Sequence, residues 1–169
     1  ILYNELEKCQ KSLEGYLEQK RNKFPRFYFV SNPVLLQILS QGSDPQAIQV
    51  YYEKIFDSVN RAVHDKKDMS MIVKIKTMKG ADEEVIDLSA PVKAQGNIED
   101  WLVKLESEMQ RTMKDLCRRA ASECGELDLR DFVDQSCGQF SLLGIQFNWT
   151  ADCHHALVKC KQSKGIMQE

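Results

Sequence analysis

The side chains best suited to chemistry lie near the C-terminal end of the sequence, in the run Cys153-His154-His155 and at Cys160. Imidazole nitrogens and thiolates are ligands that Zn²⁺ prefers in proteins. A helix turns by about 100° per residue, so three consecutive side chains cannot converge on one ion. We therefore expect two core cysteines, two surface histidines and no metal ligand, because a free cysteine packs as a small hydrophobic residue. A Cys/His metal protein is the weaker alternative.

Acidic runs at residues 82–84 and at Glu99-Asp100 are the candidates for acid–base chemistry. Neither run adjoins a recognisable apolar pocket that would raise the pKa of one carboxylate, so solvated charge is the expected state. The sequence also lacks a P-loop, a Gly-x-Ser-x-Gly elbow, a His-Glu-x-x-His pair and an EF-hand loop. We expect no catalytic residue and no cofactor-binding residue in this chain.

An aromatic block crowds three phenylalanines and a tyrosine into six residues: Phe24, Pro25, Arg26, Phe27, Tyr28 and Phe29. Pro25 ends the preceding helix, and the alternation predicts a strand or extended connector with Phe27 and Phe29 on one side and Tyr28 on the other. The block is superficially similar to the stacking strand of an RNA-binding module, but it lacks the glycines of that motif. A net charge of −2, from 23 basic and 25 acidic residues, also argues against nucleic-acid binding. We expect a buried structural joint.

Helices flank this block on both sides. An apolar seam at helical spacing precedes it, formed by Leu2, Leu6, Cys9, Leu13 and Tyr16. Packing of this seam against neighbouring helices is favoured over a short coiled coil. After the block, Asn32 is expected to cap a helix over residues 33–41, with Pro33 in its first turn and Gly42 at its end. Asp44-Pro45 repeats the signal and predicts a third helix to about Phe56.

The middle of the chain alternates with the period of a strand. Residues 71–77 place Met71, Val73 and Ile75 on one face and Lys74 and Lys76 on the other. Residues 79–82 supply a turn, and residues 84–88 return as an acidic strand, so a β-hairpin with charges paired across it is predicted. Residues 58–63 are a candidate third strand. Pro91 and Gly96 are expected to end this region.

Helices are predicted again over the last third of the sequence. Asn97 and Asp100 are typical of a helix start, and the long apolar stripe that follows runs from Trp101 to about Gly125. Cys117 and Cys124 are expected to be core residues of this helix. Two or three shorter helices are predicted to follow, at about 128–135, 138–148 and 151–163, with Thr150 capping the last.

Composition describes an ordinary globular chain of 169 residues, 43% hydrophobic and 28% charged. No signal peptide or membrane-length apolar run is visible, and six cysteines without a secretion signal favour a reducing cytosol. The sequence starts with Ile1 rather than Met, so we expect a piece of a longer protein. The predicted fold class is mainly α (α+β), with helical-bundle segments and one inserted β-hairpin. The expected divisions are residues 1–64, 65–95 and 96–169.

Several of these stretches together resemble the linker region of dynein heavy chains. The similarity is carried by residues 6–13, 16–21, 24–31 and 35–40, by the hairpin over 71–88, and by residues 96–102 and 144–150. It covers nearly the whole chain, and its details look axonemal, perhaps outer-arm. The resemblance implies a mostly helical, elongated arm across a ring of AAA+ modules, whose ATP-driven swing moves the motor along microtubules.

The resemblance also implies where the chemistry of the whole protein resides. ATP and Mg²⁺ would bind in the ring, and the fragment itself would have no cofactor and no catalytic activity. Implied partners are the intramolecular ring, dynein intermediate and light chains, and microtubules, with no nucleic acid and no membrane. The implied location is the cytoplasm, the cytoskeleton and the axoneme of a cilium or flagellum. Our hypothesis is that the hairpin and its flanks, residues 65–95, face the ring or adjoin the hinge, with Lys74 and Lys76 in the contact. A hairpin that merely covers the helices is the alternative. A stand-alone helical scaffold or adaptor is the alternative function.

Overall fold

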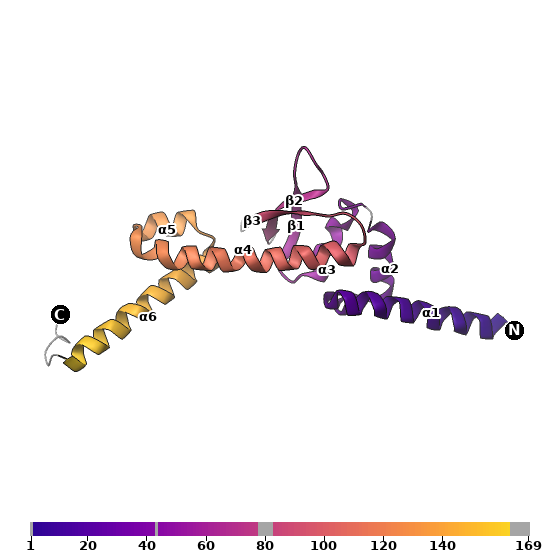
Figure 1. Ribbon diagram of the computed structural model, residues 1–169, viewed down its shortest axis with the longest axis horizontal. Coiled ribbons are helices and arrows are strands. Elements are labelled where there is room, and N and C mark those ends of the chain that lie inside the picture. The colour runs from indigo at the N-terminus through magenta and orange to yellow at the C-terminus, as the bar shows by residue number, and fades with distance from the viewer. Residues whose placement is uncertain (1, 43, 78–82, 163–169) are drawn as a thin grey trace. The chain divides into compact units, whose positions relative to one another are not determined.

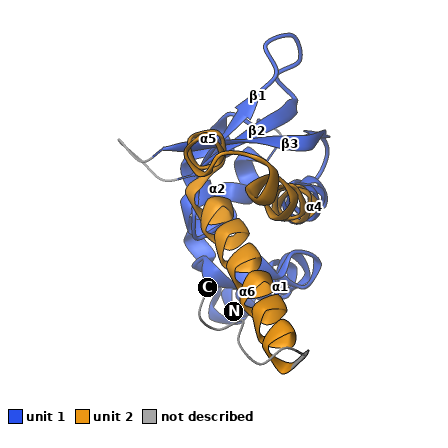
Figure 2. Ribbon diagram, turned by 90° about the vertical axis from the view of Figure 1, so that its left-hand side faces the viewer, with its two compact units in different colours: residues 1–110 blue, residues 111–169 orange. Residues whose placement is uncertain are grey.

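The computed structural model describes residues 2–42, 44–77 and 83–162, which form two compact units, residues 1–110 and residues 111–169 (Figures 1 and 2). Unit 1 combines helices with a three-stranded sheet, and unit 2 is helical, so the mainly α (α+β) prediction is confirmed. The elements of unit 1, in order, are α1 (Leu2–Lys23), the 3-10 helix η1 (Pro25–Phe29), α2 (Asn32–Gln41), the 3-10 helix η2 (Ala47–Tyr51), α3 (Tyr52–Ile55), β1 (Val59–His64), β2 (Met71–Thr77) and β3 (Glu84–Lys93). Helix α4 (Ile98–Glu126) begins in unit 1 and continues into unit 2, where α5 (Leu129–Gln135) and α6 (Gly138–Gln162) follow.

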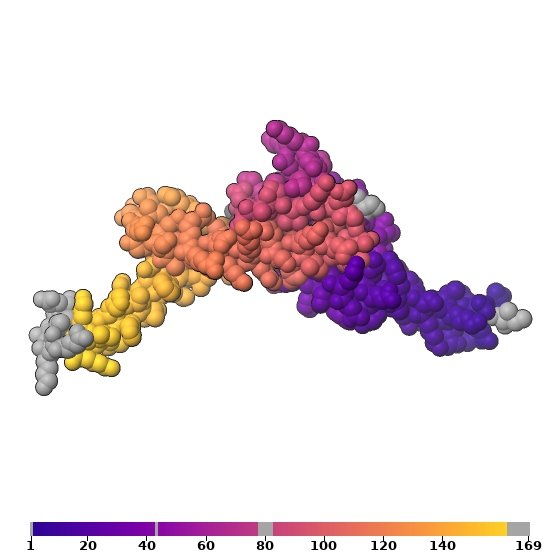
Figure 3. Space-filling model, viewed as in Figure 1, coloured from indigo at the N-terminus to yellow at the C-terminus, as the bar shows by residue number. Residues whose placement is uncertain are grey.

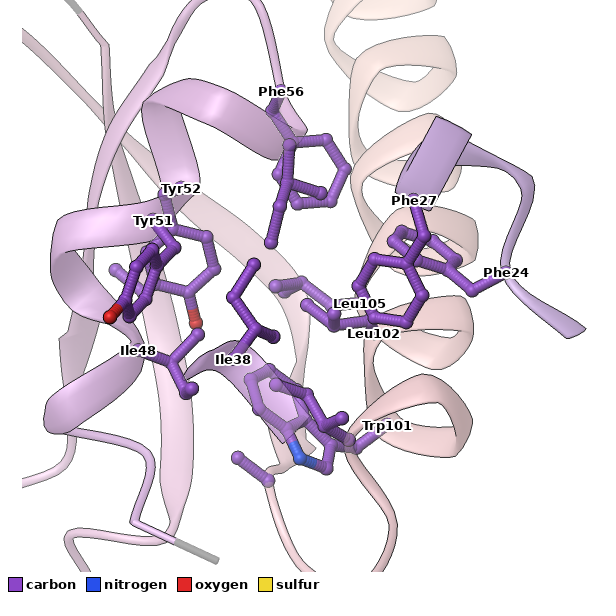
Figure 4. Close-up of a cluster of buried hydrophobic side chains, with 14 of the residues drawn as sticks. Phe24, Phe27, Ile38, Ile48, Tyr51, Tyr52, Phe56, Trp101, Leu102 and Leu105 are labelled. Carbon is purple, nitrogen blue, oxygen red and sulfur yellow. The ribbon is translucent and has the colours of Figure 1, made fainter. Parts of the chain in front are cut away.

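One hydrophobic core holds unit 1 together. Its largest fully buried side chains come from every helical element of the unit and from the sheet: Trp101, Tyr52, Phe24, Phe27, Leu17, Leu35, Ile38, Ile48, Ile55, Ile72 and Leu102. Figure 4 shows Trp101, Leu102 and Leu105 of α4 facing the aromatic rings and isoleucines of the short helices. Within the predicted third helix, Ile48, Tyr52, Ile55 and Phe56 are buried. The predicted single helix there is instead η2 followed by one turn of α-helix.

The sheet has the antiparallel order β1-β2-β3, which confirms the hairpin and the candidate third strand. The predicted alternation of residues 71–77 is partly wrong, because Ile72 and Ile75 are the buried residues of β2 while Met71 and Val73 are only half-buried. Both pairings of β2 shift register between Ile72 and Lys74, so the alternation restarts at that irregularity. The predicted turn at residues 79–82 lies outside the described residues. Pro91 does not end the region, since β3 continues to Lys93.

Side chains from the helices cover the two open edges of this sheet. The Gln49 amide donates to the carbonyl of Ala62 and accepts from its backbone N–H, both at 3.0 Å, and Gln49 also bonds the His64 ring. Burial lowers the pKa of His64. On the other edge, the backbone N–H of Ala90 donates to the Glu108 carboxylate at 2.7 Å. Paired edges resist pairing with a foreign strand.

Unit 2 is built on the second half of α4. Ala120, Phe132 and Phe140 form its buried core, with Met113, Leu116, Cys124, Cys137 and Ile145 packed against it. Helix α6 is continuous, so the prediction of a break capped by Thr150 is wrong. The Thr150 hydroxyl donates to the carbonyl of Gln146 one turn back, as a threonine inside a helix does. A Cβ at Gly144 would lie 2.8 Å from the Ala120 carbonyl oxygen, so only glycine permits this approach of α6 to α4.

Among the described residues, no helix is both long enough and apolar enough to cross a bilayer.

Candidate functional site: the aromatic corner

Within the aromatic block, Pro25–Phe29 form a short 3-10 helix, not the predicted strand or extended connector. Phe24 and Phe27 are completely buried, whereas Tyr28 and Phe29 are exposed, Phe29 by 74%. A 3-10 helix has three residues per turn, so side chains three apart share a face and the period-2 expectation fails. The rings of Phe24 and Phe27 meet edge to face, with centroids 5.0 Å apart, and Phe24 also contacts Phe56. We call residues 24–29 the aromatic corner.

Arg21, in the last turn of α1, fixes the path of the chain through this corner. Its guanidinium donates to the carbonyls of Phe27 and Val30, each at 3.4 Å, and to the side-chain oxygen of Asn32 at 2.6 Å. The expectation that Asn32 caps α2 is therefore wrong. The N-cap position is Ser31, and the Asn32 side chain is bound by Arg21 instead.

Two helix ends meet beside the aromatic corner and are joined by ion pairs. Lys20 and Lys23, at the C-terminus of α1, face Glu99 and Asp100, in the first turn of α4. The Lys20 ammonium lies 2.5 Å from the Glu99 carboxylate, and the Lys23 ammonium lies 2.9 Å from Asp100 and 3.6 Å from Glu99. Each charge also complements its own helix dipole, since cations favour C-termini and anions N-termini. The arrangement joins segments almost 80 residues apart.

Glu99 is the unexpected member of this group. Its side chain is only 2% exposed, and one carboxylate oxygen has no hydrogen-bond partner among the described residues. The expectation of solvated charge at Glu99-Asp100 is therefore wrong for Glu99. A buried carboxylate persists only when it is paired, and here Lys20 supplies the opposite charge. The signal in the sequence was the placement of two lysines at one helix end and two acids at another.

Arg26 forms a second bridge from the corner to α4. Its guanidinium donates to Glu106 at 2.7 Å and lies over the Phe56 ring, 5.0 Å from the centroid. In the exposed pair of Lys23 and Asp100, the pKa values of the two partners shift in opposite directions. The hydrogen bond from Lys23 lowers the pKa of Asp100, and the same bond raises the pKa of Lys23. The site can therefore hold α1, η1 and α4 in one arrangement.

The predicted hairpin lysines lie together on the outer face of the sheet, and both form ion pairs with acidic residues of the same hairpin. The Lys74 ammonium lies 2.6 Å from the Asp87 carboxylate, and Lys76 pairs with Glu83. The prediction of charges paired across the hairpin is thus confirmed. Arg61 lies directly opposite Lys76 in the register and is exposed. The role of Lys74 and Lys76 in contacting a ring stays a prediction.

The cysteines and histidines near the C-terminal end of the sequence do not form a metal site. No group of three potential metal ligands occurs among the described residues. The His154 and His155 rings are 6.4 Å apart, and both are exposed, as expected. Cys153 and Cys160 are only half-buried, and Cys117 is exposed, so these three are not core residues. Cys124 packs against the core of unit 2.

Comparisons with known proteins give one consistent result. The family model described as "Dynein heavy chain, N-terminal region 2" matches residues 1–120. Dynein axonemal heavy chain 5 of Rattus norvegicus is 43% identical over 99% of the chain, and the dynein gamma chain of the flagellar outer arm of Chlamydomonas reinhardtii is 41% identical over 99%. Cytoplasmic dynein 2 heavy chain 1 of Caenorhabditis elegans is 38% identical over 72%. The chain spans only 5%, 4% and 3% of these proteins.

Proposed function

The chain belongs to the dynein heavy-chain family, and from that premise we propose that its 169 residues are a stiff, non-catalytic segment of the linker arm of a dynein motor. The observation that carries this proposal is the aromatic corner. There, two fully buried phenylalanine rings and four ion pairs tie α1 and η1 to α4.

Stiffness follows from the kind of contact at this corner. Close-packed rings resist displacement, because a gap opened beside a ring would remove its dispersion contacts with the neighbouring side chains. Ion pairs that include a buried carboxylate resist separation, because an unpaired charge would remain in a poorly solvated place. An arm that transmits force needs both properties where its helices change direction.

The activity of the whole protein is part of the same proposal. The heavy chain would hydrolyse ATP with Mg²⁺ in an AAA+ ring outside these residues, and the segment would pass the resulting movement on to displacement along a microtubule. The similarity to axonemal and flagellar heavy chains supports a place in the axoneme of a cilium or flagellum, as part of the cytoskeleton. Assembly with dynein intermediate and light chains belongs to this proposal as well.

Arg26→Ala in the heavy chain tests the lever role. The substitution removes the bridge from η1 to Glu106 and the contact with the Phe56 ring, while Phe24 and Phe27 stay in place. We expect slower microtubule gliding, by roughly two-fold or more, with an ATPase rate close to that of the unaltered motor, because a softer arm loses displacement per ATP. Lys11→Ala, which removes an exposed ion pair on α1, is the matched control. Unchanged gliding for Arg26→Ala would favour a scaffold role instead.

The hairpin is proposed to face the ring, through Lys74 and Lys76. Replacing both with Glu reverses two charges and also breaks the pairs with Asp87 and Glu83. We expect gliding velocity to fall. A fourfold variant also replaces Asp87 and Glu83 with Lys in the same chain. It should form the cross-strand pairs again with the signs inverted, but positions 74 and 76 stay negative. If that fourfold variant glides at the normal rate, the lysines serve the hairpin alone.

A further inference from the structure

Helix α1 carries an apolar seam that the described part of unit 1 leaves uncovered. The seam consists of Leu2, Leu6, Cys9, Leu13 and Tyr16, which recur at alternating spacings of four and three. Leu2 is 81% exposed and Leu6 68%, and Cys9, Leu13 and Tyr16 are also exposed. The prediction that this seam packs on neighbouring helices thus finds no such helix among the described residues of unit 1. The indigo atoms of these turns lie open in Figure 3.

The spacing tells which kind of surface this seam fits. Alternation of four and three residues is the heptad pattern, in which the seam of one helix packs its side chains between those of a second helix. Two ion pairs within α1, Glu5 with Lys8 and Glu7 with Lys11, engage charges that lie outside the seam itself. The positions that flank the seam carry one formal charge among them: Tyr3, Glu5, Gln10, Ser12, Leu17 and Gln19.

We propose that the α1 seam is a docking surface for a helix of the same heavy chain that lies outside these 169 residues. The partner helix would carry an apolar stripe of heptad period with few charges beside it. The relatives that match nearly the whole chain are about twenty to twenty-five times longer, so the same polypeptide can supply the partner helix. An intramolecular helix also binds at an effective concentration that the intervening chain sets, about a millimolar for a short flexible connection, whereas a second copy of the chain binds only at its concentration in solution. The inference rests on the proposed function only in that the chain works inside a heavy chain.

Cys9 makes the test direct, because it is a thiol within the seam itself. Native heavy chain is treated with N-ethylmaleimide for a series of times, and Cys9 modification is read by mass spectrometry. The same chain unfolded in urea gives the unprotected rate. We expect native Cys9 to react at least ten-fold more slowly than in urea. A native rate within two-fold of the unfolded rate would overturn the proposal.

Two substitutions separate docking at the seam from other causes of protection. Leu13→Glu should raise the labelling rate of native Cys9 at least five-fold, whereas Lys11→Glu, on the opposite side of α1, should leave it unchanged. If Leu13→Glu prevents folding, as loss of ATPase activity would show, Leu13→Ala replaces it. Protection that neither Leu13 variant alters would contradict docking at the seam. A short bismaleimide that joins Cys9 of two heavy chains would identify a second copy as the occupant and also overturn the proposal. The gliding experiments remain independent of all these outcomes.

Discussion

Phe27→Ala is expected to lower the free energy of unfolding of unit 1 by about 3–5 kcal/mol, the usual cost of truncating a buried phenylalanine. The ring is fully buried and lies edge to face against Phe24, so its removal leaves a cavity and ends an aromatic contact. Neighbouring backbone cannot relax into the space, because Arg21 holds the carbonyl of Phe27. Urea unfolding followed by tryptophan fluorescence measures the change, since Trp101 lies in the same core.

Phe29→Ala is the matched control, because it removes the same side chain two residues away at a position that is 74% exposed. We expect a change within about 0.5 kcal/mol, as for most surface substitutions. A strand would have placed Phe27 and Phe29 on the same face, so the pair of variants also tests the geometry of the corner. Equal losses for both would contradict the 3-10 helix.

The sequence predicted the positions of most elements because their signals are local. Asp44-Pro45 begins the run of short helices, and the alternation of residues 71–77 and 84–88 gives the hairpin with its cross-strand charges. The long helix from Asn97 onward followed from its cap and its apolar stripe. In each case, the residues that decide the element lie within one or two turns, or two strands, of one another.

The failures share a different physical origin, which is the influence of distant residues. Four aromatic and β-branched residues in a row favour a strand locally, but burial of Phe24 and Phe27 beneath Phe56 selects the three-residue period. Asn32 is a residue type that often caps helices, but its side-chain oxygen accepts a hydrogen bond from Arg21 instead. Glu99 follows the rule for acids at a helix N-terminus. Its pairing with Lys20 and its burial depend on the tertiary fold.

Glu99→Ala is the second substitution for which we expect a large effect, a loss of about 3 kcal/mol, at the low end for breaking a buried ion pair. The Lys20 side chain is only 18% exposed. Without Glu99, its ammonium group either stays poorly solvated and unpaired or moves into water, which displaces the end of α1. Asp100→Ala is the control, since Asp100 pairs with Lys23 at the surface, where such pairs contribute between zero and about 1 kcal/mol. Urea unfolding of the two variants gives the comparison.

A double substitution distinguishes the pair itself from the packing around it. Replacing both Lys20 and Glu99 with Met removes the two charges together and fills similar volume, so no buried ion remains uncompensated. We expect the double variant to recover most of the loss seen for Glu99→Ala, to within about 1 kcal/mol of the original protein, as for other buried pairs replaced by apolar residues. If the double variant regains stability but its heavy chain moves microtubules more slowly than the unaltered motor does, the charges serve force transmission rather than folding. If the single Glu99→Ala loses no more than Asp100→Ala, the buried pair contributes no more to the joint than a surface pair does.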